Sequence, residues 1–167
     1  MGSFLSLPVL ILAAVLQASV GPQIRFWDGA PDLVFLLVLS WSIHAPLEES
    51  VTWALVGGIL QDLLSVAPLG LSSVGMIVVV FAVSYLSRQV QRIGFLWLTA
   101  LALAGSLFQQ MVTWLLFAAL GFTVRFADDF SFVIVPTIIY NLALVWPLYG
   151  LARVLQRRLT SSRRMEM

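Results

Sequence analysis

Long apolar runs follow one another along the chain, separated by short segments rich in proline, glycine or charged residues. Within the runs, apolar and polar residues do not alternate as they do in a half-buried strand, so the runs favour helices. A helix that crosses a bilayer needs roughly 20 apolar residues. The pattern predicts helices over residues 4–21, 31–46, 50–66, 70–87, 94–121 and 130–151. We therefore expect an all-α integral membrane protein, a bundle of about six transmembrane helices.

Composition indicates a chain that lies almost entirely in the bilayer. Its 167 residues are 60% hydrophobic and 10% charged, with a mean hydropathy of +1.00. Soluble domains carry roughly 25% charged residues. Residues 1–167 are therefore expected to form a single transmembrane domain, with membrane lipid around it and no nucleic-acid partner.

Arginine supplies every fixed positive side chain, because lysine is absent. Most arginines follow the fourth and sixth predicted helices: Arg88, Arg92, Arg153, Arg157, Arg158, Arg163 and Arg164. Short arginine-rich segments stay in the cytoplasm, so both termini are expected there, whereas Arg25, Asp28 and Asp32 fall outside. Residues 152–167 form a predicted basic cytoplasmic tail. It is either a solvated flank or a lipid-headgroup contact through Arg153, Arg157 and Arg158.

The third predicted helix carries the most organised polar position. Ala54, Gly58 and Asp62 follow one another at four-residue spacing, so they share one face of the helix. Small residues allow another helix to approach closely, and Asp62 would then point into that contact. It would accept hydrogen bonds from a neighbouring helix or from backbone N–H groups of the following turn. A proton or cation relay and a partner contact are the alternatives, although no second ionisable group is expected at this depth.

Two further sets of residues can join helices. Gln110 and Thr113 on the fifth predicted helix and Asn141 on the sixth form a polar helix seam, because amides and hydroxyls commonly link membrane helices. The alternative is a polar cavity built by Asp62, Gln110 and Asn141. In the first predicted helix, Ala14 and Ala18 make another small-residue face.

Catalytic chemistry finds little support in the sequence. Cysteine is absent and His44 is the only histidine, so thiolate and histidine-rich metal sites are excluded. No residues combine a nucleophile with a base, and no phosphate-binding loop is present. We expect no enzyme activity, no cofactor and no metal.

Three segments, taken in order, resemble the family of the rod shape-determining protein MreD. They are Pro31-Asp32-Leu33-Val34-Phe35-Leu36-Leu37, Gly57-Gly58-Ile59-Leu60-Gln61-Asp62-Leu63-Leu64 and Pro68-Leu69-Gly70-Leu71. The first is similar to the family's opening of helix 2, the second to its glycine–leucine–aspartate signature, and the third to the turn that follows. The motif positions carried over are Pro31, Asp32, Gly58, Asp62 and Gly70.

The resemblance implies a multi-pass protein of the bacterial inner membrane that binds MreC in the cell-wall elongation complex. RodA, a class B penicillin-binding protein and MreB would be its further associates. The chain would act as a non-catalytic scaffold that helps to maintain rod shape. We expect a partner's helix to dock on a small-residue face, either Ala54 with Gly58 or Ala14 with Ala18.

A substrate-binding S component of an energy-coupling-factor vitamin transporter is the alternative function. Ala14-x-x-x-Ala18 resembles the small-residue motif with which such subunits dock their coupling protein. Such a binder is expected to enclose its vitamin in a sealed polar cavity, lined by the third, fifth and sixth helices or by the outer loops.

Overall fold

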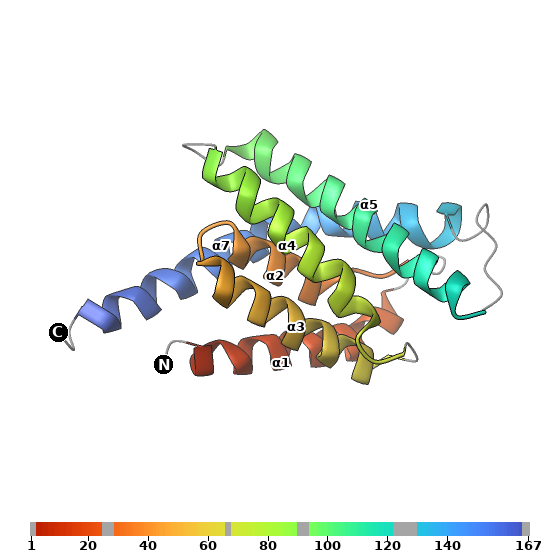
Figure 1. Cartoon of the computed structure of the whole chain (residues 1–167), viewed down its shortest axis with the longest axis horizontal. Coiled ribbons are helices and arrows are strands. Elements are labelled where there is room, and N and C mark those ends of the chain that lie inside the picture. The colour runs from red at the N-terminus through yellow and green to blue at the C-terminus, as the bar shows by residue number, and fades with distance from the viewer. Residues whose placement is uncertain (1–2, 25–28, 66–67, 90–93, 122–129, 165–167) are drawn as a thin grey trace.

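The computed structural model describes residues 3–24, 29–65, 68–89, 94–121 and 130–164. Within these residues every secondary-structure element is helical (Figure 1). The elements are α1 (Ser3–Val20), η1 (Gly21–Gln23), α2 (Leu33–Ser42), α3 (Leu47–Leu63), α4 (Leu71–Gln89), α5 (Phe95–Ala119), η2 (Phe130–Ile134) and α7 (Val135–Arg164). The chain is therefore all-α over the part that the structure describes.

Helix α2 is shorter than the expected 31–46 and lies at the centre of the molecule. Every residue from Val34 to Ser42 is buried. It packs against α1 and α3 and also against α4, α5 and α7. A helix that is apolar on all sides is stable only when neighbours cover all of those sides, and α2 meets this condition.

Helix α7 extends beyond the expected end at residue 151, as far as Arg164. Leucine, arginine and glutamine favour helical backbone, and no glycine or proline follows Gly150 to end the helix. The basic segment from residue 152 to residue 164 is therefore a continuation of the helix. In Figure 1 this continuation projects beyond the other helices, and the two chain ends lie at the same end of the molecule.

Three helices of the described chain are long and apolar enough to cross a membrane. They comprise α4, α5 and the stretch Ser131–Gln156. Shorter apolar helices cover Leu7–Gln23 and Leu33–Ser42. On α4, Val74, Val78 and Phe81 leave about half of each side chain exposed, at 52%, 46% and 50%. Such a continuous apolar surface is typical of helices that face lipid.

Candidate functional site

A close contact joins α3 to α4 at Gly58. A Cβ atom at Gly58 would lie 2.5 Å from the backbone N and Cα atoms of Ser73. The hydroxyl of Ser73 donates to the backbone oxygen of Leu55 over 3.1 Å, and Ala54 is fully buried. Because α4 covers this small-residue face, the face is closed to a partner's helix. The expectation that a partner docks on Ala54 and Gly58 therefore needs correction.

Asp62 closes the first turn of α4. Both of its carboxylate oxygens lie within hydrogen-bonding distance of the backbone N–H of Ser72, at 3.3 and 3.2 Å, and the residue is 1% exposed. The first N–H groups of a helix have no partner within the helix, and the positive end of the helix dipole favours a carboxylate there. Gly70 precedes this turn with a φ of 89°, which glycine adopts without strain. The backbone contact expected for Asp62 is therefore present.

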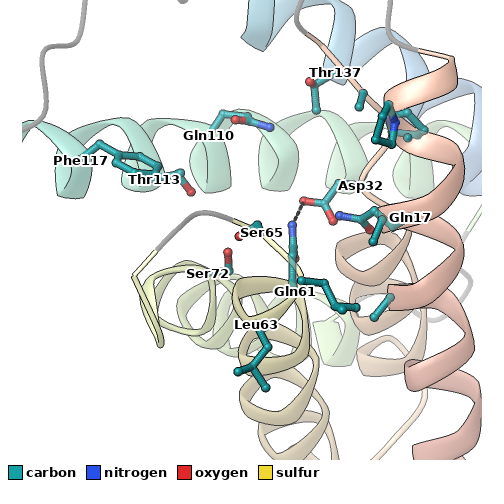
Figure 2. A pocket seen from close by; sticks show the side chains of 17 residues that line it. Gln17, Asp32, Gln61, Leu63, Ser65, Ser72, Gln110, Thr113, Phe117 and Thr137 are labelled. Carbon is teal, nitrogen blue, oxygen red and sulfur yellow. Dashed lines mark hydrogen bonds between the residues drawn. The ribbon is translucent and has the colours of Figure 1, made fainter.

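Asp32 caps the start of α2 and is buried, with 7% exposure. Its Oδ1 accepts from the backbone N–H of Phe35 over 3.1 Å, and its Oδ2 accepts from Nε2 of Gln61 over 3.2 Å (Figure 2). Its own backbone N–H donates to Oδ1 of Asn141 over 2.9 Å. The sequence predicts Asp32 among the outer polar residues. In the structure Asp32 is buried, so the chain has a second buried carboxylate in addition to Asp62.

Some polar side chains of α5 and α7 join helices through hydrogen bonds, and others line a cavity. Asn141 is buried and also donates through Nδ2 to Oγ of Ser106 over 3.0 Å, so it links α7 both to α5 and to the start of α2. Gln109 donates to the backbone oxygen of Ser72 over 3.2 Å, and Gly75 leaves the space that its side chain occupies. Gln110 and Thr113, predicted in the same seam as Asn141, instead line a cavity.

That cavity, which we call the Asp32 cavity, has a volume of about 810 Å³ and is open on one side. It lies between the end of α3 and the facing parts of α1, α5 and α7 (Figure 2). Its lining comprises Ala14, Gln17, Ala18, Gly21, Pro22, Ala30, Pro31, Asp32, Gln61, Leu63, Leu64, Ser65, Ser72, Gln110, Thr113, Phe117 and Thr137. Asp62 and Asn141 do not line it, so the cavity differs from the one that the sequence suggested.

The opposite end of the molecule carries aromatic and basic residues. The rings of Trp41 and Trp53 stack with their centroids 4.0 Å apart, and Gln156 donates through Nε2 to the backbone oxygen of Trp41 over 3.0 Å. Arg153 is exposed there, whereas the side chains of Arg157 and Arg158 lie outside the described part of the structure. The proposed headgroup contact through these arginines stays a prediction.

The buried polar side chains of the described residues act through hydrogen bonds. Over these residues, no three side chains of the His, Cys, Asp and Glu types come together as metal ligands. Sequence reasoning missed the role of Gln61, which joins α3 to Asp32 and lines the cavity. Its position next to Asp62 in an otherwise apolar run could have indicated this role. Adjacent residues of a helix point in different directions, so Gln61 and Asp62 reach different partners.

The family model for the rod shape-determining protein MreD matches residues 1–159 of the chain. No curated protein and no solved structure matches the chain.

Proposed function

Because the chain belongs to the MreD family of rod shape-determining proteins, we propose that it is a non-catalytic scaffold of the bacterial cell-wall elongation complex. In this role it lies in the inner membrane as a multi-pass protein and binds MreC. RodA, a class B penicillin-binding protein and MreB belong to the same assembly. The family match over residues 1–159 is the observation that carries the proposal.

The use of the buried polar groups supports a structural role. Asp62 holds the start of α4, Asp32 caps α2, and Asn141 links α7 to two other helices. Each of these groups satisfies a backbone or side-chain partner within the chain. A general acid or base must instead have a proton-transfer partner in a substrate. The scaffold therefore explains these residues without a reaction.

We expect MreC to dock on helix α1, because the Ala54 and Gly58 face of α3 is covered by α4. Helix α1 packs on α2 and α3 and leaves Ile11, Leu12 and Val15 exposed, at 48%, 60% and 47%. Ala14 is buried, whereas Ala18 is exposed at the edge of the Asp32 cavity. A single membrane helix of MreC would pack along this exposed side of α1, where the small side chain of Ala18 permits a close approach.

Affinity purification of the full chain from its native membranes tests the proposal. MreC is the expected co-purifying protein. Recovery of a transporter's ATPase subunits without MreC would instead favour the vitamin-binding S component. The Asp32 cavity is open rather than sealed, which gives that alternative no support.

A further inference from the structure

Asp32 and Gln61 both line the Asp32 cavity and are joined by one hydrogen bond. Asp32 accepts from Nε2 of Gln61, and this contact fixes the orientation of the Gln61 amide, because only its nitrogen end can donate. The amide oxygen, Oε1, is then buried and has no hydrogen-bond partner in the described residues. A buried acceptor without a donor is costly unless a ligand supplies one.

The charge of the lining residues favours a cationic ligand. Asp32 is the only charged residue in the lining that the structure describes, and no arginine or histidine accompanies it. From α5, on the far side of the space from Asp32, Gln110 and Thr113 add polar groups (Figure 2). A carboxylate with no positive side chain among the described lining residues favours an ammonium or guanidinium group, which carries several donors and a positive charge. A phosphate or carboxylate ligand would find no positive side chain in this lining.

We propose that the Asp32 cavity binds a lysine or arginine side chain from a short segment of a membrane partner. The inference rests on the proposed function, because it supposes a partner in the same membrane. A volume of about 810 Å³ exceeds what one cationic group fills, so residues beside the basic one can enter as well. Phe117, Leu63 and Leu64 give them apolar contacts.

An amine-bearing lipid headgroup fits the same carboxylate less well. Such a headgroup carries a phosphate next to its ammonium group, and the described lining offers that phosphate no positive partner. A peptide segment brings the positive charge without this neighbouring anion. Rim residues Leu63 and Leu64 are 60% and 49% exposed and extend the apolar surface that a peptide can cover.

Site-specific photocrosslinking in the full-length protein tests this inference. A photoreactive phenylalanine analogue replaces Thr113, and the adducts formed in native membranes are sequenced by mass spectrometry. We expect one partner segment with a lysine or arginine beside the crosslinked position. Asp32→Asn should lower the adduct yield roughly tenfold or more, because it removes one member of a desolvated charge pair.

The matched control is Glu48→Gln, which removes one negative charge from an exposed position in the first turn of α3. Its adduct yield should equal that of the unsubstituted chain. Asparagine caps a helix about as well as aspartate, so Asp32→Asn should keep its thermal midpoint and therefore its fold.

Replacing the partner's basic residue with glutamine should lower the yield as much as Asp32→Asn, and the two changes together should cost little more than either alone. Adducts only with lipid, no adduct, or an adduct that Asp32→Asn leaves unchanged would overturn the inference. The proposed function stands in those cases if MreC still co-purifies with the chain. Absence of MreC from the unsubstituted preparation contradicts the proposed function itself.

Discussion

At the scale of single residues, Asp62 shows how a carboxylate is accommodated in an apolar chain. Its two oxygens face one backbone N–H at the start of α4, and the residue is buried. Loss of the carboxylate would leave this buried N–H without an acceptor, which costs about 1–3 kcal/mol. Asp62 therefore contributes to stability by holding the end of a helix. A proton or cation relay would instead need a chain of ionisable groups.

We predict that Asp62→Leu lowers the thermal midpoint in detergent much more than Asp62→Asn, because asparagine keeps an acceptor oxygen. The expected loss for leucine is about 1–3 kcal/mol in the free energy of unfolding. Thermal unfolding followed by circular dichroism measures both variants. Equal midpoints for the two variants would show that the contact with Ser72 contributes nothing.

Gly58 supports a second prediction at this scale. Gly58→Ala places a methyl group 2.5 Å from backbone atoms of Ser73, so α4 must move away, at a cost of about 1–3 kcal/mol. Gly150→Ala in α7 is the matched control, because no heavy atom lies within 4 Å of its added Cβ and alanine favours a helix. Thermal unfolding should show a destabilised Gly58→Ala and a Gly150→Ala that is no less stable than the parent. The reverse order would contradict the packing described for α3 and α4.

The sequence could predict Asp62 but not the surroundings of Asp32. The partner of Asp62 lies ten residues away, across a turn whose glycine and proline are visible in the sequence. The partners of Asp32 are Gln61 and Asn141, at separations of 29 and 109 residues. Contacts over such distances depend on how the helices assemble, which hydrophobic pattern alone does not specify. The same reason explains why Gln110 and Asn141, close in predicted role, face different surroundings.

At the scale of elements, α2 and α7 depart most from the pattern of the sequence. The apolar run predicts a helix over residues 31–46, already short for a full span, and its cap at Asp32 and the turn before Pro46 limit α2 to ten residues. In α7 the basic segment continues the helix, because a long arginine side chain can place its charge in water while its backbone stays helical. Hydropathy locates apolar segments well but does not mark a helix end where the chain becomes polar.

The basic end of α7 gives an element-scale prediction about lipid. Replacing Arg153, Arg157 and Arg158 together with glutamine should reduce the extra stability that anionic phosphatidylglycerol gives over phosphatidylcholine. Each arginine near an anionic surface contributes about 1 kcal/mol, so the lipid preference should fall strongly. Thermal midpoints in nanodiscs of the two lipids measure it. Arg25→Gln, predicted on the opposite side, is the control, and an unchanged lipid preference in the triple variant would favour a solvated flank.

At the scale of the whole molecule, orientation can be tested cleanly because the chain contains no cysteine. Leu69→Cys lies in the turn before α4, at a residue 67% exposed and predicted outside. Glu48→Cys lies at the other end of α3 and is predicted inside. A membrane-impermeant maleimide should label Leu69→Cys in intact spheroplasts and Glu48→Cys only after permeabilisation. The opposite labelling would reverse the orientation inferred from arginine.

The whole molecule uses its polar groups to join helices and leaves an apolar exterior for lipid and partners. This arrangement suits a scaffold, because a small helical bundle can bind a partner through a helix surface and one open cavity. The family match supports a role in rod shape, and we propose that the exposed side of α1 and the Asp32 cavity are the surfaces that serve it.

Direct binding of purified MreC shows most directly whether this chain acts as a scaffold. The full-length chain, reconstituted alone in nanodiscs, is titrated with full-length MreC, and binding is followed by fluorescence. We expect saturable binding that needs no third protein and that Glu48→Gln leaves unchanged. Absence of saturable binding, with both proteins folded in the same bilayer, would contradict this expectation.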